Sequence, residues 1–317
     1  MPDQESYQLL GELFRSGPTD ELRRALKVFP ELESAAREVT EGSDRGDAED
    51  EIAAAHHSMF GFNVFPHASV FLEEDGFLGK DVTESARAFY ERSGLYAGDE
   101  REAADHITTE LLFCSRLADD APAMAEFFDT HLFAWLPSFV FAIERRKELF
   151  YSQLGRVTLD LVIKHRKKLF YQKIPADLFE DSEEPEQPVG STSDGGRSRS
   201  GDRSRGDSMS SGELVERFSG ARKCGLFLSR GDIIDLARSL KLPTGFGGRM
   251  QMLRTMFDSS QTYEREEELC AGLLNVCDQE IGRWQAIVAD GAPEALVSWS
   301  EYWTGKLRAS QGLLMKK

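Results

Sequence analysis

The sequence has little cysteine and no arrangement of cysteines that would indicate a disulfide framework. Its 317 residues include 4 cysteines, and no two of them form a C-x-x-C pair. This sparse usage is typical of free thiols in a reducing compartment. Cys270 and Cys277 are seven residues apart on an expected helix and so share one face. Small buried apolar residues are favoured there over a redox pair.

Export signals and membrane spans are also absent from the sequence. The first residues, Met1–Tyr7, contain neither a basic region nor an apolar core, so they do not resemble a secretory signal peptide. No apolar run approaches the roughly 18 residues that a membrane-spanning helix needs. Together with the cysteine usage, these absences predict a cytoplasmic protein.

Positive charge is in deficit. The chain has 38 Lys and Arg residues against 55 Asp and Glu residues, which gives a net charge of -17. A surface of this sign repels nucleic acid and anionic membranes, and it favours cationic partners. Solubility and adaptation to a salty cytosol are alternative explanations for the acidity, and both stay open.

Catalytic and cofactor motifs are missing as well. The sequence contains no H-E-x-x-H and no G-x-S-x-G. The glycine-rich stretch 245–249 lacks the Lys-Ser/Thr pair of a phosphate-binding loop. His106 and Glu110 could share a helix face as two metal ligands, but closed metal sites usually show a clearer set of ligands. The residues alone therefore favour a binding protein with neither metal nor cofactor.

Helical spacing of apolar residues recurs throughout the chain, and no useful strand alternation is found, so the sequence predicts an all-α protein. Two segments are expected to be loops: the polar stretch 40–50, and the apolar stretch 60–72, which Gly61 and Pro66 interrupt. Expected helices cover 4–16, a segment capped by Thr19, 52–60, 81–93 with an Asp81 capping box, 122–145 with a kink or division at Pro137, 149–168, a segment capped near Ser229, 250–257, 262–288, and a last helix after Pro293.

A stretch with almost no apolar residues divides the chain. Residues 180–212 are rich in Glu and Pro and then in Ser, Gly, Asp and Arg, a composition that cannot offset the entropy of ordering. Arg-Ser repeats at 197–205 superficially resemble RNA-binding tails, but interleaved Asp residues favour a spacer. We therefore predict a helical domain at 1–175, a flexible linker at 176–212 and a smaller C-terminal helical unit at 213–317.

One stretch combines a polar loop with an amphipathic helix and places an Asp-His pair between them. Asp105 is the expected N-cap, because its carboxylate can accept hydrogen bonds from first-turn amides. His106 and Glu110 then lie on one face of the helix. A helix cap with a satisfied histidine and a functional site are both compatible with this pattern.

Four blocks of sequence resemble the TorD/DmsD/NarJ family of cytoplasmic chaperones for molybdenum-cofactor oxidoreductases. Their order and spacing match over residues 5–172. Ala104 replaces the proline of the family's Glu-Pro-Asp-His, and the C-terminal unit extends beyond the minimal family domain. The blocks are Phe60-Gly-x4-Pro66-x-x-Ser69-Val70-Phe71, Gly94-Leu-Tyr with Asp105-His106-Ile-x-x-Glu110-Leu, Phe128-x-x-His131-Leu-x-x-Trp135-x-Pro137-x-Phe139, and Phe150-Tyr151-x-x-Leu.

The resemblance implies a TorD-like helical bundle without catalytic activity. Family members bind the twin-arginine signal peptide, or an N-terminal remnant of it, on the catalytic subunit of a molybdopterin oxidoreductase. They hold that subunit in the cytoplasm until its cofactor is inserted, before export or assembly. A homodimer is a further partner that the resemblance leaves open.

A twin-arginine leader joins a basic region to an apolar one, so its receptor needs an apolar groove with carboxylates at one end. Asp105 and Glu110 are expected to receive guanidinium groups, and His106 to steady that edge or to sense pH. The remaining predicted peptide-binding residues are Phe65, Pro66, Ser69, Phe71 and Trp135.

Two alternatives remain from the sequence. The chain could be an adaptor that acts through its C-terminal unit, in which case partner binding should survive deletion of residues 1–175. It could also be an enzyme or metalloprotein that uses Asp105, His106 and Glu110, in which case the purified protein should contain bound metal.

Overall fold

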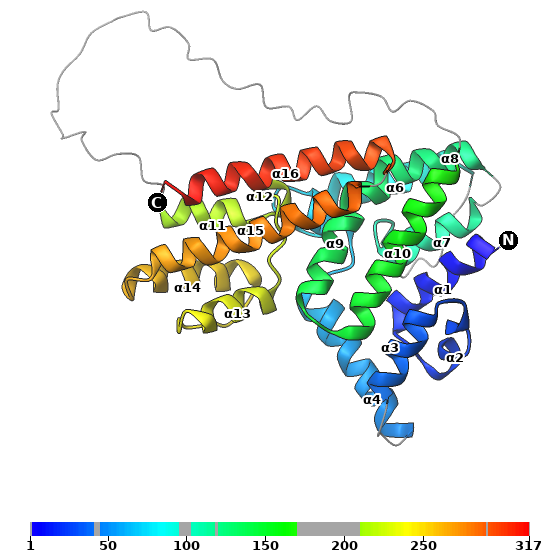
Figure 1. Cartoon of the computed structure of the whole chain (residues 1–317), viewed down its shortest axis with the longest axis horizontal. Coiled ribbons are helices and arrows are strands. Elements are labelled where there is room, and N and C mark those ends of the chain that lie inside the picture. Colours follow the sequence, from blue (N-terminus) through cyan, green and yellow to red (C-terminus); the bar gives the residue numbers. More distant parts are fainter. Residues whose placement is uncertain are drawn as a thin grey trace, which may run out of the picture.

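A computed structural model describes residues 2–40, 45–94, 103–117, 120–169, 210–289 and 291–316. Within these ranges every regular element is a helix, and the single bridge between extended residues joins His67 to His106. The predicted all-α class is confirmed (Figure 1). The predicted linker at 176–212 lies outside the described residues except for its last three positions.

Among the described residues, thirteen helical elements lie between positions 2 and 169. Two of them, η2 and η3, are π-helical, and η1 is a 3-10 helix. The elements are α1 (Pro2–Ser16), α2 (Asp20–Arg23), η1 (Leu26–Val28), α3 (Pro30–Thr40), α4 (Arg45–His56), η2 (His57–Asn63), α5 (Ala68–Leu72), α6 (Lys80–Arg92), α7 (Ile107–Arg116), α8 (Ala121–Phe127), η3 (Phe128–Leu132), α9 (Phe133–Arg145) and α10 (Leu149–Lys168).

Six further helices lie in the described residues from position 210 onward: α11 (Ser211–Ser219), α12 (Ala221–Cys224), α13 (Arg230–Ser239), α14 (Arg249–Thr262), α15 (Glu266–Val288) and α16 (Glu294–Leu314). Ser229 caps α13 as predicted, in a reciprocal capping box with Asp232. Ser210 and Glu213 form a second capping box at the start of α11. None of these helices, nor any other in the described ranges, is long and apolar enough to cross a membrane.

The predicted loop at 60–72 is wrong. A π-helical segment continues α4 as far as Asn63, and α5 begins at Ala68. The wide turn ends where Val64 N donates to Met59 O at 2.8 Å. Burial of Met59 and Phe60 holds this turn in place, and Pro66 falls between the two helices, where its missing N–H breaks no ladder.

Three predicted boundaries also need correction. The loop expected at 40–50 ends early, because α4 already begins at Arg45. Gly79, rather than Asp81, is the N-cap of α6, so no capping box forms there. Pro137 lies inside α9 and does not divide it, because the helix runs from Phe133 to Arg145 without interruption.

The basic residues at the end of α10 are not all solvated, because Arg166 is buried. Its Nε and Nη2 donate to the Asp129 carboxylate at 2.8 and 2.7 Å, and both side chains are buried. His165 is buried beside it and lies 2.9 Å from the Tyr7 hydroxyl. Only the lysines of this cluster face solvent.

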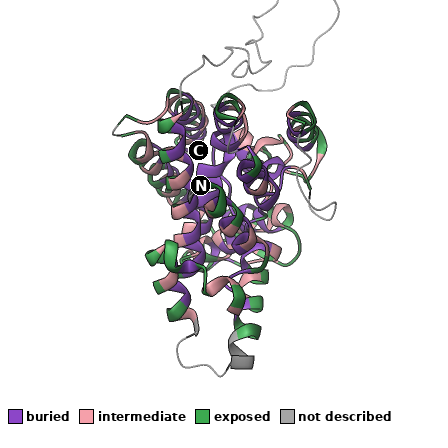
Figure 2. Ribbon diagram, turned by 90° about the vertical axis from the view of Figure 1, so that its right-hand side faces the viewer, coloured by how far each residue is buried: buried purple, intermediate pink, exposed green. Residues whose placement is uncertain are grey.

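Buried residues run through the interior of the bundle (Figure 2), and those of positions 2–169 and 210–316 belong to one hydrophobic cluster. Helix α9 is buried along its whole length from Phe133 to Ile143 and packs against α15 and α16. Trp299 and Trp303 of α16 donate their indole N–H groups to Asp129 O and Ala134 O, both at 2.9 Å. The division of the chain into domains stays a prediction, and in the described ranges the buried residues of both parts form one contiguous cluster.

A buried ion network joins the same two parts. Arg145 of α9 donates to Glu280 at 2.6 Å and lies 3.4 Å from Asp232, and Arg146 donates to Asp232 at 2.9 Å. A buried charge is destabilising unless it is paired, so this network fixes how α13 and α15 sit on α9. The four cysteines are free and buried, as expected for Cys270 and Cys277.

Candidate functional site

Two blocks of the predicted site lie side by side. Ala68 N donates to Asp105 O, and Ile107 N donates to Pro66 O, both at 2.9 Å. This pairing gives the antiparallel bridge between His67 and His106, whose rings pack edge to face with centroids 4.7 Å apart. The segment before α5 is therefore joined directly to the segment before α7.

Asp105 holds this junction together from a fully buried position. Its carboxylate accepts hydrogen bonds from Ser69 N at 2.9 Å and from Thr83 Oγ1 at 2.8 Å, and His67 Nδ1 lies 3.8 Å away. Burial alone would raise the pKa of Asp105, but His67 and the hydrogen bonds from Ser69 and Thr83 outweigh it and hold the pKa well below the usual range. Asp105 is thus a buried anion.

The prediction that Asp105 caps its own helix is wrong. His106 is the N-cap of α7, and its Nδ1 accepts a hydrogen bond from Thr108 N at 3.2 Å. Asp105 instead accepts a hydrogen bond from Ser69 N in the first turn of α5. The side chain of His67, the N-cap residue of α5, makes no such bond. Burial, with a contribution from His67, lowers the pKa of His106 to about 3, so this imidazole is neutral near pH 7.

Glu110, expected to receive a guanidinium group, lies in the core. Its Oε2 accepts a hydrogen bond from Trp135 Nε1 at 3.0 Å, and its Oε1 has no hydrogen-bond partner among the described residues. Burial raises its pKa well above the usual value, so the side chain favours the neutral acid. In this conformation Glu110 supports Trp135 and does not reach the surface.

Replacement of Glu110 by glutamine is expected to stabilise the protein at alkaline pH. A carboxyl group whose pKa is raised by folding contributes stability below its unfolded pKa, and this contribution is lost as the pH rises. Glu110→Gln should match wild type near pH 4 and exceed its free energy of unfolding by about 1 to 3 kcal/mol at pH 8. Urea denaturation at both pH values measures this. Equal stability at pH 8 would contradict a buried acid whose pKa is raised by folding.

The predicted apolar groove is already filled. Phe71 and Trp135 are fully buried, with ring centroids 5.7 Å apart, and Phe227 from the C-terminal part packs on Phe71 at 4.8 Å. Pro66 is buried too, and Phe65 alone among the predicted groove residues is exposed, at 38%. The structure thus brings Ser69, Asp105 and His106 together at the junction and places Phe71, Glu110 and Trp135 beneath it.

Three further residues belong to this site but were not predicted. His67 lies inside the Pro66–Ser69 block, where its place between two matched positions could have identified it. Thr83 comes from α6, and Phe227 comes from beyond the linker. Neither carries a local sequence signal, because each reaches the site only through tertiary packing.

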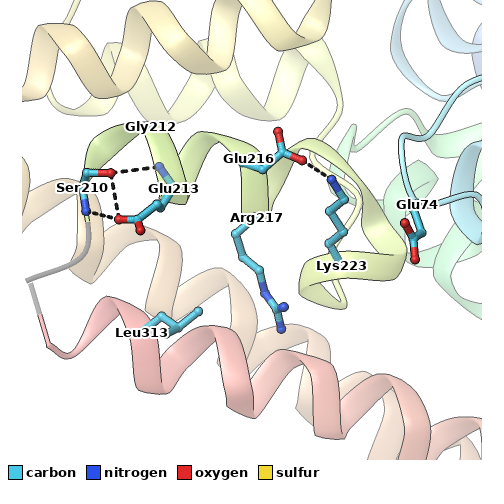
Figure 3. A pocket seen from close by; sticks show the side chains of 8 residues that line it. All are labelled: Glu74, Ser210, Gly212, Glu213, Glu216, Arg217, Lys223 and Leu313. Carbon is cyan, nitrogen blue, oxygen red and sulfur yellow. Dashed lines mark hydrogen bonds and ion pairs between the residues drawn. The ribbon is translucent and has the colours of Figure 1, made fainter. Parts of the chain in front are cut away.

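An open pocket of about 610 Å³ lies where α11, α12 and α16 meet the loop after α5 (Figure 3). Three carboxylates and two cations line it, so its charge is mixed and slightly negative. Lys223 is paired with Glu216, and Arg217 Nε donates to Ser310 at 3.2 Å. The lining residues are Glu74, Ser210, Gly212, Glu213, Glu216, Arg217, Lys223 and Leu313. Across the described ranges, no three His, Cys, Asp or Glu residues are grouped as a metal site requires.

Comparison with known proteins agrees with the sequence motifs. The family described as nitrate reductase delta subunit matches residues 19–140. A selenate reductase assembly chaperone protein from Thauera selenatis is 34% identical over 108 residues. The match covers 29% of this chain and 55% of that relative, so the chain spans little more than half the length of the protein it resembles. Residues 19–140 therefore match the TorD/NarJ-family domain of redox-enzyme assembly chaperones.

Proposed function

We propose that the protein is a cytoplasmic maturation chaperone without catalytic activity. It binds the twin-arginine signal peptide, or its N-terminal remnant, on the catalytic subunit of a molybdopterin oxidoreductase and holds that subunit until its cofactor is inserted. The observation that carries the proposal is the family match over residues 19–140, which includes the junction of the two signature blocks. The assembly-chaperone relative supports the same class of activity.

In this proposal the buried residues of the junction hold in place the surface segment that contacts the leader. Asp105 and His106 are buried and engaged with backbone and side-chain groups, so they fix the shape of the 65–69 segment. Phe65 projects from that segment at the surface. In this proposal Phe65 contacts the apolar part of the leader, Pro66 and Ser69 set its position, and Phe71, Glu110 and Trp135 line the groove beneath.

The net charge of -17 favours a partner with a basic leader. A long-range field of this sign raises the encounter rate with cationic peptides, and the effect falls with salt. An adaptor that acts through its C-terminal unit alone gains no support, because α16 and α9 share one core.

Co-elution with a client tests the proposal. The full chain is mixed with catalytic subunits of several molybdopterin oxidoreductases, each with and without its leader, and separated by size exclusion. We expect a complex with at least one leader-bearing subunit and none with its leaderless form. Phe65→Ser should weaken that complex about tenfold, whereas Val28→Ser, another exposed apolar residue at 64%, should not. Equal complexes with both forms of every subunit would refute leader recognition.

A further inference from the structure

We propose that the segment Arg222–Leu228 is an internal substitute for the leader, and that a client leader binds by displacing it from the groove over Phe71. This inference rests on the proposed function and adds to it the location of the groove and its regulation. The groove is closed in the isolated chain by a residue of the C-terminal part, Phe227.

The segment has the chemistry of the ligand it would replace. Two adjacent cations, Arg222 and Lys223, precede the apolar run Leu226–Leu228. A twin-arginine leader presents the same order, a pair of cations followed by apolar residues. Residues 226–229 adopt no helix, so the run lies as an irregular connection between α12 and α13.

The apolar run fills the groove that the sequence predicted. Leu226, Phe227 and Leu228 are all buried, and the Phe227 ring lies 4.8 Å from Phe71 at an interplanar angle of 38°. Phe71 in turn contacts Trp135. The backbone of the run is held at one point by Arg145, whose Nη2 donates to Phe227 O.

The two cations of the segment lie beside the end of α5 and the open pocket next to it. Arg222 Nη1 donates to Leu72 O, the last residue of α5, at 3.0 Å. Lys223 points into the pocket and pairs with Glu216, while Glu74 lines the opposite side (Figure 3). Carboxylates beside an apolar groove are what a basic-apolar peptide requires.

Gly225 separates the two parts of the segment and fits them closely to α16. Its φ is +83°, and a Cβ on it would come within 2.7 Å of Leu307 N and 2.9 Å of Trp303 O. Only glycine is compatible with both the backbone conformation and this approach. The segment is therefore a fitted part of the fold, with a turn that places the cations outside and the apolar run inside.

Exchange of one basic-apolar segment for another replaces buried apolar surface with similar surface. The apparent dissociation constant of the leader is then its intrinsic value divided by the fraction of molecules with an open groove. Weakening the internal segment raises that fraction, so it should tighten leader binding without changing any residue that touches the leader.

Hydrogen exchange of the full chain tests the displacement. We expect the backbone amides of Leu226–Leu228 to exchange at least tenfold faster when a synthetic twin-arginine leader is present at saturation. Unchanged or slower exchange there, with the leader bound, would overturn the inference and leave the proposed function standing. If no leader binds at all, both fail.

A matched pair of variants gives a second test. Phe227→Leu should bind the leader several-fold more tightly than wild type, because the contact with Phe71 is reduced. Phe257→Leu is the control, because Phe257 is equally buried, at 2%, and lies in the same part of the chain, on α14. Its leader affinity should equal that of wild type. Equal affinity in both variants, or equal tightening in both, would contradict an internal competitor at Phe71.

Discussion

Asp105→Ala is expected to lower the free energy of unfolding by about 3 kcal/mol or more. The substitution leaves two buried donors, Ser69 N and Thr83 Oγ1, without an acceptor, and each such group costs about 1 to 3 kcal/mol. It also removes the anion that faces His67. Urea denaturation of the full chain at pH 7 measures the loss.

The pH dependence of the free energy of unfolding distinguishes the loss of the Asp105 anion from the loss of its side-chain volume. Because the folded pKa of Asp105 is depressed, its contribution is present above the unfolded value of 3.8 and is lost as the pH falls through the folded pKa. The gap between wild type and Asp105→Ala should be constant from pH 5 to 8 and should narrow below about pH 3.8. Asp81→Ala, an exposed acid on α6, should change stability by less than about 0.5 kcal/mol. A loss no larger than this control would contradict the positioning role.

Trp303→Ala is expected to destabilise both parts of the chain together. Trp303 is fully buried, stacks on Trp284 with centroids 6.4 Å apart and donates to Ala134 O of α9. Truncation of a buried tryptophan typically costs about 3 to 5 kcal/mol through the cavity it leaves. Since the core is shared, helices α9 and α16 should unfold in one transition at a lower urea concentration.

Amides in two helices, α9 and α16, show whether both parts of the chain lose stability in Trp303→Ala. Hydrogen exchange of amides in α9 and in α16 should report the same reduced free energy of opening in Trp303→Ala. Phe246→Ala, at a residue that is 92% exposed, should leave both unchanged. A loss of protection confined to residues 210–316, with α9 unaffected, would show that the C-terminal part folds separately.

Much of the fold follows from local sequence signals. Helical periodicity predicts the all-α class, and Thr19 and Ser229 cap helices as their positions indicate. The errors fall where tertiary packing overrides a local rule. Gly61 and Pro66 predict a loop, but burial of Met59 and Phe60 supports a π-helical turn and a short helix around them.

The sequence predicts which segments form the candidate site, but it does not predict their geometry. The motif blocks mark two segments that pair in the structure, Pro66–Ala68 and Asp105–Ile107. Spacing alone cannot show that Asp105 caps α5 across the fold, nor that Glu110 points into the core. Phe71 and Phe227 are far apart in the sequence and lie on opposite sides of the predicted linker. No local sequence pattern can therefore connect them.

Calorimetric titration of the full chain with a synthetic twin-arginine leader tests the central claim most directly. We predict a dissociation constant in the micromolar range or tighter, about -8 kcal/mol, for at least one leader of a molybdopterin oxidoreductase. Replacing its two arginines by alanine should weaken binding at least tenfold, because the carboxylates at the end of the groove lose their charged partners. If several leaders give no binding heat and none competes with another, the chain does not recognise signal peptides and the account is wrong.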